Sequence, residues 1–307
     1  MPQEIQKILV TGSSGTIGTR LCELLLKQEY SIVGFDRRPN RWNVEIDEKT
    51  IRGDLRETAS LAGIPEDIDC IIHLAANARV YKLVENPQLA QDNVETTFNI
   101  LNFARQHNIS RFLFGSSREV YGNSDKAVHE ESELSVERCE APYTASKIAG
   151  ESLVHAFQQC YGIDFVILRF SNVYGMYDDT DRLIPLFITL AKEHKELVVF
   201  GKDKLLDFTY IDDAVFGIML AIKKFSAAKN DTYNIATGTG TPITRVAEHM
   251  KALLRSDSQI VVKANRPGEV VQFIANIKKA KEKLGYKPST TIGDGLKQAV
   301  TWYEKNT

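Results

Sequence analysis

The chain has 307 residues, of which 43% are hydrophobic and 25% are charged. These proportions are close to those of ordinary globular proteins and exclude a disordered chain or a coiled coil. The 38 lysines and arginines nearly balance the 40 acidic residues and leave a net charge of −2. No basic field is therefore expected to bind a nucleic acid through its phosphates. A chain of this length suits one large α/β domain or two closely joined ones.

No apolar run in the sequence approaches the about 18 residues that a membrane span needs, so we expect no membrane partner. The first residues lead at once into an apolar strand, without the basic and long apolar regions of a secretion signal, which predicts a cytoplasmic protein. The cysteines have neither zinc-type nor disulfide-framework spacing, so no metal site is expected. They are Cys22, Cys70, Cys139 and Cys160.

The first half of the chain alternates short β-branched runs with longer segments of helical periodicity. This alternation predicts βαβ units and a Rossmann-type, doubly wound parallel sheet. The expected strands lie near Lys7–Thr11, Ser31–Asp36, Ile51–Gly53, Cys70–Leu74, Arg111–Ser116 and Asp164–Arg169. The expected helices between them are Ile17–Gln28, Gln88–His107 and Tyr143–Cys160.

The regular alternation weakens after Arg169, where loops rich in aspartate and glycine separate shorter elements. This change predicts a smaller α/β subdomain for the substrate, made of residues 171–210 and 231–307. Residues 1–170 and about 211–230 are expected to form the cofactor-binding Rossmann domain, with a helix over Ile211–Lys224 that returns to the first sheet. Because no flexible linker divides the two parts, we expect them to share a cleft.

Three glycines separate the first expected strand from the first expected helix. Gly12, Gly15 and Gly18 are spaced by two residues each. A dinucleotide requires a tight turn, a backbone that approaches the pyrophosphate without a side chain, and the free N–H groups of a helix N-terminus. The spacing therefore predicts a dinucleotide site, to which Thr16 and Ile17 also belong.

The second expected strand ends in Asp36, at the position where a carboxylate accepts hydrogen bonds from both hydroxyls of the adenosine ribose. A 2′-phosphate beside this carboxylate would be repelled, so Asp36 favours NAD over NADP. Arg37 and Arg38 follow directly and leave NADP open as an alternative.

Tyr143 and Lys147 are four residues apart and therefore share one face of an expected helix. Ser117 directly follows an expected strand, so its side chain leaves the sheet at the carboxyl edge, where open α/β folds bind ligands. Hydride removal from a carbinol needs a base for the hydroxyl proton, and a phenol with a pKa of about 10 is too protonated at neutral pH. We expect Lys147 and the positive nicotinamide to lower the pKa of Tyr143.

Further segments in the same order carry a resemblance to a known family. They are Gly53-Asp54-Leu55, His73-Leu74-Ala75-Ala76, Asn93-Val94, Val120-Tyr121-Gly122, Arg169-Phe170-Ser171-Asn172-Val173-Tyr174-Gly175, Val199-Phe200-Gly201, Asp207-Phe208-Thr209-Tyr210-Ile211-Asp212-Asp213 and Arg266-Pro267-Gly268-Glu269. With the glycine turn and the Ser–Tyr–Lys set, the chain resembles the extended short-chain dehydrogenases/reductases. Within them it resembles the NAD-dependent sugar-nucleotide epimerase/dehydratase family, which includes the UDP-glucose 4-epimerases, and the resemblance covers nearly the whole chain.

The resemblance implies roles for residues on the cofactor side. Tyr143 is implied as the base, with Ser117 as its hydrogen-bonding partner, and Tyr143 and Lys147 also border the cofactor. Asp54 and Leu55 are implied to flank the adenine. The other implied cofactor-binding residues are Leu74, Ala75, Ala76 and Asn93.

The resemblance also implies a nucleotide-sugar site. Asn172 and Arg266 would hold the diphosphate and Glu269 the ribose of the nucleotide, while Val198 and Phe200 would contact its base and Ser117 the sugar. Helices Gln88–His107 and Tyr143–Cys160 would pair with their counterparts in a second copy, which implies a homodimer with a four-helix bundle.

The family's common first step is oxidation at sugar C4. A 4-epimerase returns the hydride to the other face and needs little beyond Ser117, Tyr143 and Lys147, whereas a 4,6- or 5,6-dehydratase also removes the C5 proton. Glu119 stands where family dehydratases carry a glutamate, and Arg118 stands where many carry an aspartic acid. We therefore predict an NAD-dependent NDP-sugar epimerase with tightly bound, recycled NAD, most plainly a 4-epimerase. A dehydratase with Glu119 as its C5 base remains the alternative.

Two further positions bear on the choice of substrate. Leu206 replaces a usual arginine, which disfavours a decarboxylase and leaves Arg266 as the main phosphate contact, with help from Lys202 or Lys204. Phe273 stands where some 4-epimerases have a residue beside the sugar C2 substituent, and a ring there favours plain hexoses over N-acetylated ones.

Two further classes remain as alternatives. A keto-sugar reductase dependent on NAD(P) would release its cofactor in each turnover. A nucleotide-binding sensor or scaffold would share the fold without the activity. Such members usually lose the tyrosine–lysine pair, so its presence here favours an enzyme.

Overall fold

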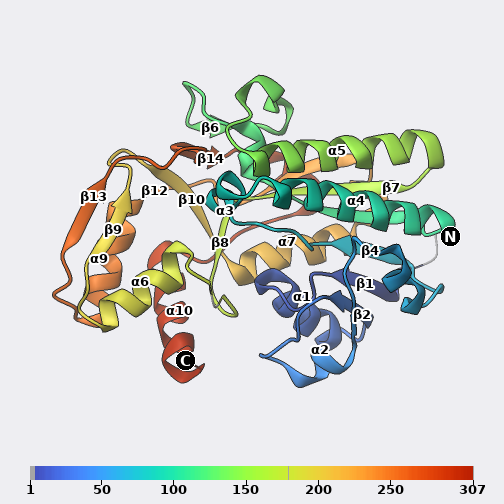
Figure 1. Cartoon of the computed structure of the whole chain (residues 1–307), viewed down its shortest axis with the longest axis horizontal. Coiled ribbons are helices and arrows are strands. Elements are labelled where there is room, and N and C mark those ends of the chain that lie inside the picture. The colour runs from blue at the N-terminus through green and yellow to red at the C-terminus, as the bar shows by residue number, and fades with distance from the viewer. Residues whose placement is uncertain (1–3, 179, 307) are drawn as a thin grey trace.

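The computed structural model describes residues 4–178 and 180–306, and its larger part is built on a parallel sheet of seven strands (Figure 1). The strand order is β11-β7-β5-β4-β1-β2-β3, so the direction of winding reverses between β1 and β4, the position where open α/β sheets bind ligands. The predicted Rossmann-type fold is thereby confirmed. The strands are β1 (Lys7–Thr11), β2 (Ser31–Asp36), β3 (Thr50–Arg52), β4 (Cys70–His73), β5 (Arg111–Ser117), β7 (Asp164–Phe170) and β11 (Asp231–Ile235).

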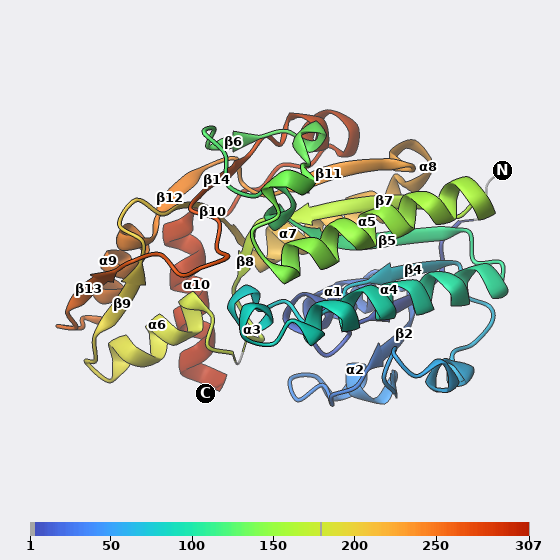
Figure 2. The ribbon, with the colours of Figure 1, turned by 45° about the horizontal axis from the view of Figure 1, so that its top comes forward.

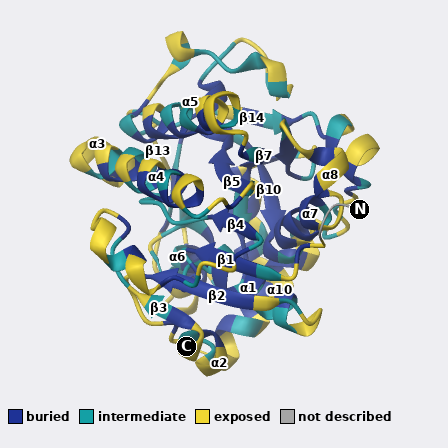
Figure 3. Cartoon of the chain, turned by 90° about the vertical axis from the view of Figure 1, so that its right-hand side faces the viewer, coloured by how far each residue is buried: buried dark blue, intermediate teal, exposed yellow. Residues whose placement is uncertain are grey.

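Helices cover both faces of this sheet. Figure 2 shows α4 (Gln88–Gln106) and α5 (Pro142–Tyr161) side by side over one face, with α1 (Thr16–Lys27) and α7 (Ile211–Lys223) over the other. Because strand side chains alternate, Ile8 and Val10 pack in one apolar cluster and Leu9 packs in the other. Strands buried on both faces therefore have continuous apolar runs, and Figure 3 shows buried residues along the whole sheet.

A second group of elements lies beside the large sheet, at the left and toward the middle of Figure 1. Its five-stranded sheet has the order β12-β10-β14-β6, with β8 paired to β10, and β9 pairs with β13 separately. These strands are β6 (Val128–His129), β8 (Asn172–Tyr174), β9 (Leu197–Phe200), β10 (Leu205–Tyr210), β12 (Gly240–Pro242), β13 (Ile260–Lys263) and β14 (Gln272–Ala275). Its helices are α6 (Leu183–Lys192), α9 (Ile243–Leu254) and α10 (Ile292–Asn306).

Short elements connect these parts. They are the helices α2 (Val44–Glu48), α3 (Val80–Glu85) and α8 (Phe225–Ala228), the 3₁₀ turns η1 (Thr58–Gly63), η2 (Arg118–Tyr121), η3 (Glu131–Glu133) and η4 (Val136–Arg138), and the π-helical turn η5 (Ala280–Leu284).

Two strands depart from the predicted division of the chain. The segment 231–235, assigned to the substrate subdomain, forms β11 and pairs with β7 at the edge of the large sheet. Conversely, β6 comes from the first 170 residues but pairs with β14 of the second sheet. Both strands are short edge strands, and their partners are distant in the sequence, so no local pattern indicates which sheet takes them.

Within residues 4–178 and 180–306, none of the helices combines the length and apolar character needed to cross a bilayer. The same residues contain no cluster of three or more His, Cys, Asp or Glu side chains placed to hold a metal ion. All four cysteines are free thiols.

Candidate active site

The glycine turn between β1 and α1 is closed to side chains. Gly12 has φ +77°, and a Cβ on it would lie 2.8 Å from the Ala75 nitrogen. A Cβ on Gly18 would lie only 2.0 Å from the Gly12 carbonyl oxygen. Gly15 caps α1 without a side-chain hydrogen bond, so the first N–H groups of the helix are available to an anion. The turn therefore has the tight backbone and the free N–H donors that a pyrophosphate requires.

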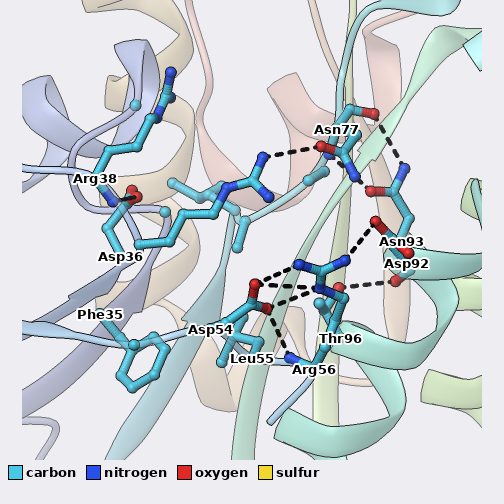
Figure 4. Close-up of a pocket in the computed structure, with 17 residues that line it drawn as sticks. Phe35, Asp36, Arg38, Asp54, Leu55, Arg56, Asn77, Asp92, Asn93 and Thr96 are labelled. Atoms are coloured by element: carbon cyan, nitrogen blue, oxygen red, sulfur yellow. Dashed lines mark hydrogen bonds and ion pairs between the residues drawn. The ribbon is translucent and has the colours of Figure 1, made fainter. Parts of the chain in front are cut away.

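A pocket extends from this turn along the carboxyl edge of β1, β2 and β4 (Figure 4). At one end, the Asp36 carboxylate accepts hydrogen bonds from the N–H groups of Ser14 (3.0 Å) and Arg38 (2.9 Å), which fix its orientation. The Arg37 guanidinium donates to the Asn77 side chain at 3.2 Å. The lining residues are Gly12, Gly15, Phe35, Asp36, Arg37, Arg38, Gly53, Asp54, Leu55, Arg56, Leu74, Ala75, Ala76, Asn77, Asp92, Asn93 and Thr96.

A charged group forms the opposite wall of the pocket in Figure 4. The Arg56 guanidinium lies 2.7 Å from the Asp54 carboxylate and 3.1 Å from that of Asp92. Its hydrogen bonds hold the pKa of Asp54 below its ordinary value. Asn93 accepts from the Asn77 N–H at 2.7 Å and donates to the Ser146 hydroxyl of α5 at 3.1 Å. Asn93 therefore ties the loop after β4 to the helix that carries Tyr143.

These features fit NAD. The glycine turn admits a diphosphate and no side chain, the oriented Asp36 carboxylate can accept from ribose hydroxyls, and the wall beside Leu55 is partly apolar. Nine of the residues predicted for the cofactor line this one pocket: Gly12, Gly15, Asp36, Asp54, Leu55, Leu74, Ala75, Ala76 and Asn93. Gly18, Thr16 and Ile17 lie at the turn and at the start of α1.

Ser117, Tyr143 and Lys147 meet where β5 ends against α5. Pro142 opens α5 in the first turn, where its missing N–H costs nothing, and Tyr143 follows directly. The Lys147 ammonium donates to the Gly115 carbonyl at 2.7 Å and lies 5.9 Å from the centre of the Tyr143 ring. All three side chains are more than nine-tenths buried.

The titration of this group differs from the sequence-based expectation in one respect. Burial raises the pKa of Tyr143 to about 12, although a hydrogen bond with Ser117 and the charges of Arg182 and Arg118 oppose this rise. Burial also lowers the pKa of Lys147 to about 8. We expected Lys147 to lower the pKa of the phenol, but in this structure desolvation dominates. Further positive charge is therefore needed beside Tyr143 before it can act as a base near neutral pH.

Arg118 and Glu119 form a buried ion pair next to Tyr143. The Arg118 Nη2 lies 2.8 Å from the Glu119 Oε1, and both side chains are less than one-tenth exposed. The Nε of Arg118 donates to the Asn172 Oδ1 at 3.1 Å. Burial raises the pKa of Glu119, and the Arg118 charge lowers it. Asn172, predicted to hold a diphosphate, is thus held by Arg118 at the start of β8.

The residues predicted for the nucleotide lie in the second group of elements, on β9 and in the segment between β13 and β14. The Arg266 guanidinium stacks 3.8 Å from the centre of the Phe200 ring and 5.2 Å from that of Tyr81 in α3. Glu269 pairs with the buried Lys204 ammonium at 2.5 Å. Val198 lies two residues before Phe200 on the half-buried strand β9. The arginine and the ring offer a flat, cationic surface that suits a base and its phosphates.

Phe273 and Leu206 are both buried and lie in adjacent strands, β14 and β10. Phe273 is only 1% exposed and stacks with Tyr121 and His129, while its ring centre lies 5.7 Å from the Arg118 guanidinium. In this structure Phe273 therefore packs behind Arg118, and its place beside the sugar C2 substituent stays a prediction.

Sequence reasoning missed several residues of the site, among them Arg182, Asn77 and Arg56. Arg182 precedes α6, is one-third exposed, and its charge lowers the pKa of Tyr143. The sequence feature that could have revealed Arg182 is its position as a basic residue between an acidic loop and the start of a helix. Asn77 and Arg56 in the cofactor pocket gave no signal, because neither lies in a spaced motif.

A family model described as the NAD dependent epimerase/dehydratase family matches residues 8–236. The UDP-glucuronate 4-epimerase of Thermodesulfobacterium geofontis is 29% identical over 315 residues, which cover 97% of this chain and 96% of the relative. The dTDP-glucose 4,6-dehydratase of Salmonella typhimurium is 28% identical over 345 residues, which cover 98% and 93%. The solved UDP-glucose 4-epimerase of Thermotoga maritima with UDP-glucose is 27% identical, with a TM-score of 0.89 over 98% of this chain and 99% of its own.

Proposed function

Since the chain belongs to the NAD-dependent epimerase/dehydratase family, we propose that it is an NDP-sugar 4-epimerase that works through a transient 4-keto sugar. The observation that carries this proposal is the arrangement around Tyr143. Ser117 and Lys147 lie beside the phenol, whereas Glu119, the base that a dehydratase would need, is held in an ion pair by Arg118.

NAD, when bound, supplies the group that accepts a hydride from sugar C4 and returns it. Tyr143 takes the proton of the C4 hydroxyl, and Ser117 stabilises the phenolate by a hydrogen bond. Lys147, anchored on the Gly115 carbonyl, places its ammonium below the ring. The proton returns from Tyr143 after the opposite face of the keto sugar has turned toward the same groups, which completes the inversion.

We assign the nucleotide end of the substrate to the second group of elements, the one that contains β8 and β9. Arg266 and Asn172 are proposed to hold the diphosphate, Phe200 and Val198 the base, and Glu269 the ribose. The stacking of Arg266 on Phe200 supports this assignment, because it places a fixed cation beside an aromatic surface. Relatives named for UDP-glucuronate and dTDP-glucose leave the nucleotide and the sugar open.

A dehydratase is the second candidate. Glu119 is buried at the end of β5, two residues after Ser117, and its charge acts on the Tyr143 phenol. A carboxylate there could remove the C5 proton of a 4-keto sugar. A keto-sugar reductase is less well supported, because it needs free exchange of NAD. A cofactor-binding sensor is also less well supported, because it needs neither Tyr143 nor Lys147.

We further propose a cytoplasmic homodimer with a four-helix interface of α4 and α5. Phe98 on α4 and Tyr161 on α5 are 45% and 54% exposed, so aromatic surface that a partner helix could cover lies on both helices. Phe98 packs edge-on against Phe157, at 6.0 Å between ring centres, so both helices contribute to one outer face.

A proton NMR time course with pooled NDP-hexoses in D2O, without added cofactor, tests the proposed activity. The expected result is a new NDP-hexose with inverted C4 and no deuterium at C5. A C6 methyl or methylene signal would show that the protein is a dehydratase and not an epimerase. A reaction that depends on added NAD(P)H would support the reductase.

A further inference from the structure

The Arg118–Glu119 pair occupies a position that the proposed reaction leaves unexplained. Both residues lie in η2, which leaves the carboxyl edge of the sheet directly after Ser117. The Ser117 hydroxyl accepts a hydrogen bond from the Glu119 N–H at 3.2 Å, which fixes the start of the turn. The charges of both side chains act on the Tyr143 phenol. The pair therefore lies next to the group that handles the C4 hydroxyl.

Glu119 is satisfied at only one of its two carboxylate oxygens. Oε1 lies 2.8 Å from the Arg118 Nη2, whereas Oε2 is buried and has no hydrogen-bond partner among residues 4–178 and 180–306. A buried carboxylate oxygen without a partner loses its hydration and gains no compensating bond. Such an oxygen readily accepts a proton from any acidic group that reaches it.

Arg118 is held from three sides. Its Nε donates to Asn172 at the start of β8, its Nη2 pairs with Glu119, and its guanidinium lies against the buried Phe273 ring of β14. Because β8 and β14 contact Arg118 from outside η2, its guanidinium is fixed relative to both strands, although its Nη1 has no hydrogen-bond partner in the described part of the chain. Glu119, which is bound to it, is held there as well.

The 4-keto sugar is the species from which such a carboxylate would remove a proton. A ketone at C4 acidifies the hydrogens on C3 and C5, because the electron pair left by the proton can move onto the carbonyl oxygen. Loss of the C5 proton forms an enolate, from which the C6 hydroxyl can be expelled. An epimerase has no use for this step, since its only bond changes are at C4 and the C4 hydroxyl.

We propose that Arg118 is a positioning residue that determines the outcome of the reaction, because its ion pair holds Glu119 away from the acidified hydrogens of the 4-keto sugar. This inference rests on the proposed 4-epimerase function. Without Arg118, Glu119 in its ionised form reaches C5: the C5–H bond breaks, the proton passes to Glu119 Oε2, and the electron pair moves to the C4 oxygen. In D2O the carboxylic acid exchanges its proton with solvent and returns a deuteron to C5.

The test compares deuterium at C3 and C5 in four proteins: the unaltered enzyme, Arg118→Met, Arg118→Lys and the double variant Arg118→Met/Glu119→Gln. UDP-glucose, UDP-galactose and UDP-glucuronic acid serve as probes in D2O, and the sugar that the unaltered enzyme inverts is followed by NMR. Methionine keeps an apolar stem of similar length without the charge, while lysine keeps the charge. Bound NAD and far-UV circular dichroism check that each variant is folded.

The unaltered enzyme and Arg118→Lys are expected to invert C4 without incorporating deuterium at C3 or C5. Arg118→Met is expected to incorporate at least about ten times more deuterium at C5 per inversion, and the double variant to return to the background. A merely structural role of Arg118 would lower turnover without changing this ratio. If Arg118→Met does not fold, Arg118→Leu is used, since leucine also removes both the charge and the hydrogen bonds to Glu119.

Three results would overturn the inference. They are deuterium at C5 with the unaltered enzyme, inversion by the neutral Arg118 variant without deuterium, and incorporation that persists in the double variant. Failure of the unaltered enzyme to invert any probe, or any other NDP-hexose of the pool, would instead remove the proposed function. The two failures are therefore separate.

Discussion

At the scale of single residues, burial sets the chemistry of the Ser117, Tyr143 and Lys147 group. Desolvation raises the pKa of Tyr143 to about 12 and lowers that of Lys147 to about 8, so both groups are pushed toward their neutral forms. A positive charge placed beside the phenol by the nicotinamide acts against this effect. Proton removal is therefore coupled to the presence of the oxidised cofactor, which suits an enzyme that recycles NAD.

The variant Tyr143→Phe tests the role of this phenol. Turnover is expected to fall by about 10²- to 10⁴-fold, because the base is lost while the ring remains. Bound NAD, measured after acid extraction, is expected to be unchanged. Tyr286→Phe is the control, since it removes a buried hydroxyl without a hydrogen-bond partner in the described part of the chain. Turnover of Tyr143→Phe within about tenfold of the unaltered enzyme would exclude Tyr143 as the base.

His73 predicts a pH dependence of stability. Burial lowers its pKa from 6.5 to about 3. Below pH 6.5 the unfolded chain binds a proton that the folded chain does not, so the free energy of unfolding falls by about 1.4 kcal/mol per pH unit. Between pH 6.5 and pH 5, His73 is expected to lower the free energy of unfolding, measured with urea, by about 2 kcal/mol. In His73→Gln this part of the pH dependence should be absent, and an unchanged slope would contradict the assignment.

At the scale of elements, the β1–α1 turn shows why glycine is required at a particular position. The backbone of α1 passes so close to Gly12 that a Cβ on Gly18 would lie 2.0 Å from the Gly12 carbonyl oxygen. The turn cannot open without moving β1 or α1, and both are packed in the core. Gly18 therefore fixes the angle at which α1 meets the sheet and the position of its N–H donors.

The variant Gly18→Ala is expected to lose bound NAD while retaining most of its secondary structure. The reason is that the clash displaces the helix N-terminus from the pyrophosphate position. Gly63→Ala is the matched control, because the nearest heavy atom to its new Cβ lies 3.7 Å away. Bound NAD and circular dichroism are the measurements. Full NAD occupancy in Gly18→Ala would show that the turn does not hold the cofactor in this way.

At the scale of the whole molecule, long-range contacts join the two groups of elements. Trp42, in the loop after β2, packs against Trp302 of α10 with 5.0 Å between ring centres, and Tyr177 lies 5.2 Å from Trp302. The Tyr177 hydroxyl also donates to Glu23 of α1. The C-terminal helix is thus attached directly to the cofactor-binding half of the chain.

The proposed dimer makes a prediction at the same scale. Phe98→Glu is expected to produce monomers in light scattering after size-exclusion chromatography, because it places a charge in the proposed four-helix interface. Phe216→Glu is the control, since Phe216 is 44% exposed, much like Phe98, but lies on α7 over the other face of the sheet. A Phe98→Glu protein that remains dimeric, or dissociation of both variants, would exclude this interface.

The fold could be predicted from the sequence because a parallel sheet buried on both faces requires continuous apolar runs, and strands β1, β2 and β4 show them. The cofactor side could be located because a diphosphate demands glycines at fixed spacing. The exchange of β6 and β11 between sheets and the contact of Trp42 with Trp302 could not be predicted. These pairings join residues far apart in the chain, and no local period reveals them.

The most direct test of the proposed function follows one deuterium atom from sugar C4. The purified enzyme is given UDP-glucose, UDP-galactose and UDP-glucuronic acid, each labelled with deuterium at C4, in ordinary water and without added cofactor. The proposal predicts that deuterium stays at C4 of the product while the configuration there inverts. Deuterium at C6 would establish a dehydratase. Loss of the label from the sugar would show that the cofactor does not return the hydride to the sugar. Either result would contradict the 4-epimerase.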